Sequence, residues 1–194
     1  MKAAKLFIII TVLLSMCCTR QSTTLVLPEN CEFINYNDSS QIYGILNKPL
    51  KIVIWADSIG CTGCKLELDK WEYAIAELDS KFPDQLGYLF FLQFKDREDL
   101  EFLLGMDSID DYYDSEDTYE QDDMEGLCFP LPVVWDPKGN FGKINGIKGY
   151  KCFIIDEDNN ILFSGEPPFT TENKEKYVKV IEKYIMNSDY PNIK

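Results

Sequence analysis

The amino-acid sequence predicts an α/β fold in which a central mixed sheet is flanked by helices. One observation is the order of elements in the first half, where two apolar runs, residues 50–55 and 88–94, are each followed by a helical segment. Strand, helix, strand, helix in that order implies parallel strands joined by a right-handed crossover. The other observation is a pair of β-rich runs around a polar loop at residues 152–163, which indicates an antiparallel hairpin.

The elements of the first half follow from their apolar spacing. Residues 33–36 and 42–46 are short mixed segments around a polar turn, for which we expect an edge hairpin or a strand and a turn. The nearly continuous apolar run at 50–55 is typical of a strand covered on both faces. Apolar residues at three- and four-residue steps then predict a helix over 68–82, and a second helix is expected over 97–105.

The second half continues the same α/β pattern. We expect a strand at 132–135 and a short helix or irregular turn at 141–147. A terminal helix after Thr170 or Thr171 should bury three side chains on one face: Tyr177, Val180 or Ile181, and Tyr184. Between these halves, residues 107–125 hold ten acidic residues and no Lys or Arg, so we expect a solvated insertion at about 107–126.

Composition bounds the domain count and excludes several function classes. The chain has 194 residues, 45% of them hydrophobic, which is enough for one well-filled domain. A formal charge of −14 makes nucleic acid a poor partner, because phosphate binding needs clustered Lys and Arg. The sequence contains no histidine, which excludes Cys-His and Ser-His-Asp catalysis, a c-type haem and histidine-containing zinc sites.

The first 17 residues predict a lipoprotein signal peptide. Lys2 and Lys5 precede an apolar run that is too short to span a membrane comfortably. The stretch Leu14-Ser-Met-Cys17-Cys18 resembles the lipobox of bacterial lipoproteins, in which a small residue precedes the cysteine that is lipidated. Leu14 favours Cys17 as the anchor, although Met16 occupies the small-residue position, and Cys18 is the alternative. A cleaved signal without a lipid is the other interpretation.

Residues 18–30 predict a tether, and residues 31–187 the globular domain. The tether segment is polar, contains Pro28, and reaches about 35 Å when extended. Acyl chains would hold it on a membrane, because each buried methylene contributes about 0.8 kcal/mol. Loss of Lys2 and Lys5 with the signal lowers the formal charge of the mature chain from −14 to −16.

The motif that points to chemistry is Cys61-Thr-Gly-Cys64, between the strand at 50–55 and the helix that follows. Two thiols separated by two residues in this position are a redox signature. Unpaired backbone N–H groups and the helix dipole favour a thiolate at Cys61. Cys64, about one turn later, is close enough to attack a mixed disulfide formed at Cys61.

The order of elements around this motif resembles the thioredoxin fold over roughly residues 31–185. The stretches Trp55-Ala-Asp-Ser-Ile-Gly-Cys61-Thr-Gly-Cys64, Pro132-Val-Val-Trp-Asp136 and Phe153-Ile-Ile-Asp156 are similar to thioredoxin-like envelope lipoproteins, of the TlpA or redoxin type, from the Bacteroidetes. The resemblance implies that Cys61 is the attacking thiol, that Cys64 resolves the intermediate, and that no bound cofactor is required. It also implies that Tyr150 and Trp55 lie beside the substrate groove.

Two features depart from the thioredoxin pattern. Thioredoxins have a cis-proline just before the strand that matches 152–155, whereas this chain has Gly149-Tyr150-Lys151. A cis bond without proline costs about 3 kcal/mol, so we expect a trans peptide and a different groove. Two extra residues also separate Trp55-Ala56 from Cys61, which would shift the thiol relative to the sheet.

The sequence therefore predicts a membrane-anchored thiol-disulfide oxidoreductase of the bacterial envelope, its domain facing the periplasm. Its partners would be a disulfide-containing envelope protein and a thiol-disulfide electron donor. Two alternatives stay open. In one, the Cys61–Cys64 disulfide is structural and the chain is a non-catalytic binding or scaffold protein. In the other, Cys128 and Cys152 complete a metal site, although buried single cysteines are more often core residues.

Overall fold

The fold is described from a computed structural model that covers residues 24–28, 32–34, 39–58, 66–105, 129 and 131–188. Four predicted features lie outside the described residues: the signal peptide at 1–17 with Cys17 and Cys18, the Cys61 and Cys64 motif, the acidic insertion at 107–126, and Cys128.

Within the described residues, six strands form one mixed sheet in the order β1-β4-β3-β2-β5-β6. Strands β2 and β3 are parallel, as are β3 and β4, whereas β5 is antiparallel to both β2 and β6, and β1 is antiparallel to β4. The predicted mixed sheet and its C-terminal hairpin are therefore confirmed. The strands are β1 (Glu32–Ile34), β2 (Leu50–Ala56), β3 (Leu86–Leu92), β4 (Val133–Trp135), β5 (Lys151–Ile155) and β6 (Ile161–Gly165).

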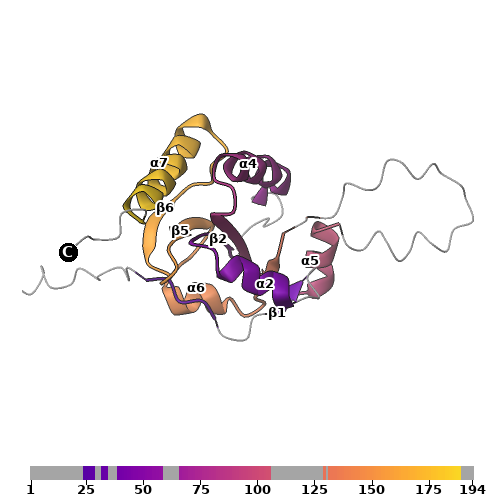
Figure 1. The fold of residues 1–194 in the computed structure, drawn as a ribbon. Coiled ribbons are helices and arrows are strands. Elements are labelled where there is room, and N and C mark those ends of the chain that lie inside the picture. The colour runs from indigo at the N-terminus through magenta and orange to yellow at the C-terminus, as the bar shows by residue number, and fades with distance from the viewer. Residues whose placement is uncertain are drawn as a thin grey trace, which may run out of the picture.

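Helices cover both faces of the sheet (Figure 1). Helices α4 and α7 pack on one face, and α2 and α6 pack on the other. The described helices are α2 (Ser39–Leu46), α4 (Leu68–Lys81), α5 (Arg97–Leu103), α6 (Asn140–Asn145) and α7 (Thr171–Ser188). None of them, over the residues described, is both long and apolar enough to cross a bilayer.

The alternating side chains of β2 and β3 divide the core into two layers. Ile52, Ile54 and Phe90 point toward α4 and α7, whereas Val53 and Trp55 point toward α6. All of them are at most 2% exposed. A strand that is buried on both faces reads as a continuous apolar run, which is why residues 50–55 are apolar almost throughout.

The prediction for the segment before β2 is right at its start and wrong at its end. Residues 32–34 form the edge strand β1, but residues 42–46 lie in helix α2. The reason is the spacing of Ile42, Ile45 and Leu46, which places three apolar side chains on one side of a helix. This side packs on β3 at Gly87, where a Cβ atom would lie 2.6 Å from the Ile45 carbonyl oxygen.

The C-terminal helix matches its prediction. Helix α7 begins at Thr171, and its Tyr177 and Ile181 side chains have no exposed surface. Val180 and Tyr184 are partly buried against the same core layer. The ring of Tyr177 packs edge to face against Phe163 of β6, with 5.1 Å between ring centroids. Helix α7 thereby covers the hairpin that the sequence predicted.

Helix α6 approaches the sheet closely because residue 142 is glycine. A Cβ atom at Gly142 would lie 2.7 Å from the Trp55 ring and 2.9 Å from the Ile147 carbonyl oxygen. Phe141 beside it stacks on Phe91, with 4.4 Å between centroids, and lies 5.5 Å from the Trp55 ring. The sequence prediction of a short helix or turn at 141–147 is met by a six-residue helix.

Gly142→Ala should lower the free energy of unfolding by about 1–3 kcal/mol, because the added methyl group overpacks the contact with Trp55. Gly44→Ala is the matched control, since nothing lies within 4 Å of a Cβ atom there and Gly44 is also helical. The control should be neutral or stabilising by up to about 1 kcal/mol through helix propensity. Urea unfolding of both variants measures the difference, and equal stabilities would contradict this account of α6.

Candidate functional site

The candidate site is defined by the residues on either side of the Cys61-Thr-Gly-Cys64 motif. The motif itself lies outside the described residues. The chain leaves the described region after Ser58, two residues beyond the end of β2, and is described again from Leu66, two residues before α4. Specific contacts hold the chain near these two points.

The strand side of the motif is held by Asp57. One oxygen of its carboxylate, Oδ2, accepts a hydrogen bond of 2.5 Å from the backbone N–H of Gly149. Charge-assisted bonds of this kind are short and stronger than neutral ones. The next residue, Ser58, donates its backbone N–H to Oε1 of Gln93 at 3.4 Å, and the Gln93 N–H donates to the Ala56 carbonyl at 2.9 Å. These bonds join the ends of β2 and β3.

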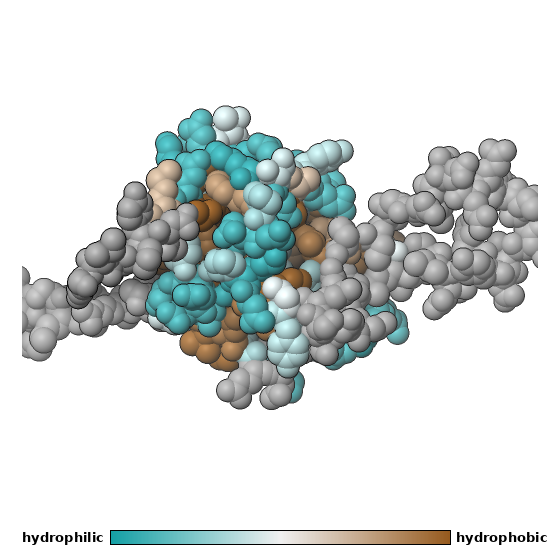
Figure 2. Space-filling view, in the orientation of Figure 1, coloured by the Kyte–Doolittle hydropathy of each residue, from teal (hydrophilic) through white to brown (hydrophobic). Residues whose placement is uncertain are grey.

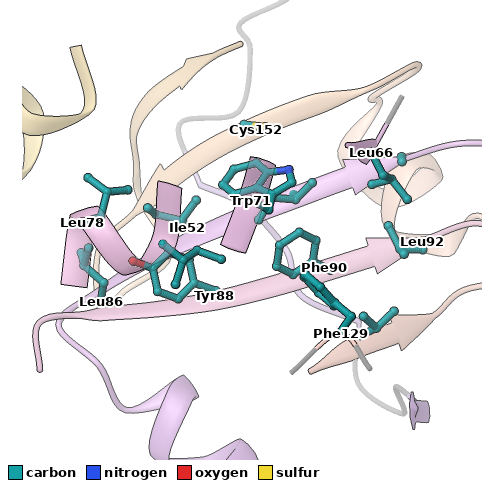
Figure 3. Close-up of a cluster of buried hydrophobic side chains, with 14 of the residues drawn as sticks. Ile52, Leu66, Trp71, Leu78, Leu86, Tyr88, Phe90, Leu92, Phe129 and Cys152 are labelled. Atoms are coloured by element: carbon teal, nitrogen blue, oxygen red, sulfur yellow. The ribbon is translucent and has the colours of Figure 1, made fainter. Parts of the chain in front are cut away.

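The helix side of the motif is held by Trp71 of α4. Leu66 and Trp71 both have no exposed surface, and Figure 3 shows the Trp71 ring lying over the sheet between Cys152 and Phe90. The Trp71 ring makes edge contacts with Phe90 at 5.5 Å and Phe169 at 5.3 Å between centroids. Its indole Nε1–H donates to the hydroxyl of Tyr150 at 2.9 Å.

The turn at Gly149 and Tyr150, which leads into β5, therefore contacts both sides of the motif. Gly149 meets the strand side through Asp57, and Tyr150 meets the helix side through Trp71. Gly149 has a φ of 73°, a left-handed conformation that favours glycine. No peptide bond among the described residues is cis, so the trans geometry predicted at this turn is confirmed.

The comparisons with known proteins are all at the level of the fold. No family model matches the chain, and no curated protein matches its sequence. Among solved structures, a thioredoxin-like protein in its oxidized form matches with a TM-score of 0.50 at 10% identity, covering 84% of this chain and 97% of that one. The chain has a thioredoxin-like fold.

Two further solved structures are similar to this thioredoxin-like chain. A Chlorobium tepidum protein assigned as thiol:disulfide interchange protein DsbE has a TM-score of 0.49 and 16% identity, over 72% of this chain and 82% of its own. A Bacteroides thetaiotaomicron protein assigned as a protein disulfide isomerase also has a TM-score of 0.49, with 12% identity, over 86% of this chain and 91% of its own.

The thioredoxin-like fold separates the two residues predicted beside the substrate groove. Tyr150 lies at the candidate site, partly exposed and bonded to Trp71. Trp55 is 2% exposed and packs with Phe141 in the core layer on the opposite face of the sheet. A side chain buried to this extent cannot touch a substrate, so we assign Trp55 to the core.

Cys152 lies beneath the site and is a core residue of the thioredoxin-like domain. Its side chain has no exposed surface, and burial raises the pKa of the Cys152 thiol to about 12. The hydroxyls of Tyr150 and Tyr177 both lie near this thiol. The Tyr177 hydroxyl is buried without a well-formed hydrogen bond, so the sulfur is a neighbour and not a strong partner. A protonated, buried thiol is a poor nucleophile and a poor metal ligand.

Two residues of the site could not be assigned from the sequence. Asp57 precedes the motif and bonds to a residue 92 positions away, and Trp71 bonds to a residue 79 positions away. Helical periodicity places Trp71 in the core, which is correct, but does not reveal its hydrogen bond. A carboxylate directly after a buried strand and before a thiol motif is the only signal for Asp57 in the sequence.

Tyr150→Phe should lower the free energy of unfolding by about 1–3 kcal/mol, because it leaves the buried indole N–H of Trp71 without its acceptor. Tyr43→Phe is the matched control, since Tyr43 is 64% exposed on α2 and should tolerate the change. A double-mutant cycle with Trp71→Phe, measured by urea unfolding, should give a coupling of about 1 kcal/mol. Additive effects would show that this hydrogen bond does not hold the turn.

The burial of Cys152 predicts a loss of stability at alkaline pH. The folded state raises the pKa of this thiol from 9.0 to about 12, so it holds the proton more tightly than the unfolded chain does. The protonated Cys152 thiol therefore contributes fully to the unfolding free energy below pH about 9. This contribution is lost as the pH rises toward about 12. Burial also raises the pKa of Tyr88, Tyr150 and Tyr177, which are half ionised near pH 10 in the unfolded chain, but these tyrosines are present with or without Cys152.

Between pH about 9 and 10, the unfolding free energy should therefore fall less steeply with pH in Cys152→Ala than in the unsubstituted protein. The two slopes should differ by up to about 1.4 kcal/mol per pH unit. Urea unfolding at closely spaced pH values measures the slope. The small cavity left by the substitution shifts the whole curve and does not change its slope. Parallel curves for the two proteins would show that the Cys152 thiol titrates equally in both states.

Proposed function

We propose that this chain is a thiol-disulfide oxidoreductase of the bacterial envelope that uses the Cys61 and Cys64 pair. The observation that carries the proposal is the Gly149–Tyr150 turn, which bonds to Asp57 before the motif and to Trp71 after it. In a thioredoxin-like fold, such contacts give the motif a fixed frame on both sides. A catalytic pair benefits from rigid supports, because small displacements weaken attack by the nucleophile.

Chain connectivity also keeps the thiols near this frame. Cys61 is three residues after Ser58, and Cys64 is two residues before Leu66. At about 3.8 Å between consecutive Cα atoms, Cys61 lies within about 11 Å of Ser58 and Cys64 within about 8 Å of Leu66, whatever their conformation. The partly exposed Tyr150 is thus a candidate for contact with a substrate at the site.

The proposed reaction is a two-step exchange. The Cys61 thiolate attacks one sulfur of a substrate disulfide, and the other substrate sulfur leaves as a thiolate that takes up a proton. The Cys64 thiolate then attacks the Cys61 sulfur of the mixed disulfide, releasing the second substrate thiol and leaving a Cys61–Cys64 disulfide. Two electrons pass to the substrate, and a thiol donor of the envelope reduces the pair again. The same steps in reverse oxidise a substrate dithiol.

The burial of Cys152 argues against the alternative of a metal site. That site would need the Cys152 thiol as a ligand, and metal-bound cysteine is deprotonated. Here the thiol has no exposed surface and its pKa is raised to about 12.

We also propose that Cys17, or Cys18 in its place, carries the lipid that anchors the chain. The partners would be a disulfide-containing envelope protein and a thiol donor.

The proposal predicts three different outcomes for three cysteine substitutions. Cys61→Ser should abolish turnover of an aromatic model disulfide, because it removes the nucleophile. Cys64→Ser should halt the reaction at the mixed disulfide, which mass spectrometry detects as an adduct. Cys152→Ala is the control and should retain turnover, since its thiol is buried.

The alkylation rate of the reduced protein against pH provides the second measurement. Cys61 should titrate well below the value of about 8.5 for a free thiol. A thiol that titrates at its ordinary value, together with no turnover in the unsubstituted protein, would support the non-catalytic scaffold with a structural disulfide.

A further inference from the structure

The N-terminal segment at residues 24–28 is fixed to the domain beside α6. Leu25 is 2% exposed, and its backbone N–H donates to the Asn159 carbonyl at 2.8 Å. The Asn145 side chain holds Val26 at both backbone groups: Oδ1 accepts from the Val26 N–H at 2.8 Å, and Nδ2 donates to the Val26 carbonyl at 2.9 Å. The tether predicted over 18–30 is therefore shorter, because residues 24–28 belong to the domain.

Apolar side chains project into solvent on either side of this attachment. Val26 is 49% exposed and Ile144 of α6 is 53% exposed. The backbone of Val26 lies against α6 one residue from Ile144, because the Asn145 side chain bonds to it. Figure 2 shows brown, apolar surface at the lower edge of the molecule, over α6. Exposed apolar side chains grouped at one place often mark a contact surface.

Lysines are concentrated in the stretch of sequence that contains Ile144, in an otherwise acidic chain. Residues 137–151 contain four lysines and no Asp or Glu, although the whole chain has a formal charge of −14. The four lysines are exposed: Lys138, Lys143, Lys148 and Lys151. Asp136, directly before this stretch, is buried. The exposed Glu157 and Asp158 lie in the hairpin turn that bonds to Leu25 through Asn159. The positive charge is thus concentrated along α6 and the residues after it.

We propose that the surface formed by Val26, Ile144, Lys138, Lys143 and Lys148, here the lysine face, rests on the lipid bilayer that holds the anchor. Thr24 is seven residues after Cys17, a distance of about 25 Å when extended, so the described chain begins close to its proposed anchor. Apolar side chains flanked by lysines fit the boundary between acyl chains and phosphate headgroups. The inference rests on the anchor included in the proposed function, and not on the redox chemistry.

The tether explains why such a face can bind within an acidic protein. Without an anchor, the mature chain of formal charge −16 is repelled by an anionic membrane at distances within the screening length. A short tether raises the effective concentration of the lysine face at the membrane, and local contacts then decide the orientation. With the lysine face on the lipid, the Gly149–Tyr150 turn lies beside the membrane, because it follows Lys148 directly. Substrate groups presented at the membrane surface would then lie within reach of the candidate site.

The test uses the full chain, purified from bacterial membranes and reconstituted into vesicles of equal parts brominated phosphatidylcholine and phosphatidylglycerol. Ile144→Trp places a fluorescent reporter in the lysine face. Its emission should fall roughly twofold through contact with brominated acyl chains, which begin within about 10 Å of the surface. Tyr73→Trp is the matched control: Tyr73 is 79% exposed on α4, on the opposite layer, and its reporter should not be quenched.

Charge reversal separates docking from anchoring. Lys143→Glu with Lys148→Glu should restore most of the emission of the reporter at position 144. Lys179→Glu with Lys183→Glu, two exposed lysines of α7, should leave the quenching unchanged. Vesicle flotation reports the anchor independently of the reporter.

Each outcome has one meaning. A chain that floats with the vesicles but shows equal emission at positions 144 and 73 overturns the docking and leaves the anchor intact. A blue shift at position 144 without quenching also overturns it, and indicates that a second copy of this chain covers this face. A chain that does not float overturns the anchor and the docking together. Turnover of the model disulfide is unaffected by all three results and tests the redox proposal separately.

Discussion

The hydrogen bond from the Trp71 indole to the Tyr150 hydroxyl is the interaction on which the candidate site depends. It joins helix α4, which follows the thiol motif, to the turn that leads into β5. The neighbouring bond from Gly149 to Asp57 joins the same turn to the end of β2. Because the Trp71 side chain has no exposed surface, breaking its bond leaves the indole N–H without water to replace the partner. The turn, the strand and the helix are thus fixed as one unit.

Burial decides what chemistry is open to Cys152. Its side chain lies among core residues, including the rings of Tyr150 and Tyr177, and burial holds its thiol in the protonated form. The Cys61 and Cys64 pair follows β2 and precedes α4 in the sequence. In the proposed function this pair carries out the exchange, and Cys152 takes no part in it. Of the two tyrosines near Cys152, Tyr150 bonds to Trp71 at the site, and Tyr177 of α7 packs on Phe163 of β6.

The proposed redox function and the proposed membrane orientation meet at one stretch of chain. Residues 137–151 contain α6, the exposed lysines and the turn that frames the motif. Gly142 lets α6 lie directly on Trp55, so the lysine face is fixed relative to the sheet. An orientation imposed on α6 by lipid would therefore be transmitted to the whole domain. Lipid contact and substrate access would be set by the same rigid element.

The sequence by itself determined the mixed α/β fold and the order of its elements, because these depend on apolar periodicity and on residues close in the chain. It also supplied the Cys61-Thr-Gly-Cys64 motif on which the proposed redox function rests. It was wrong for residues 42–46, where helical spacing and close packing at Gly87 prevailed over a β-like composition. Only the tertiary structure decided that Trp55 belongs to the core, that residues 24–28 belong to the domain, and that Asp57 and Trp71 meet one turn. Those assignments depend on contacts between segments that are more than 70 residues apart in the sequence. Trp71 bonds to a residue 79 positions away and Asp57 to one 92 positions away, and no local sequence pattern encodes such contacts.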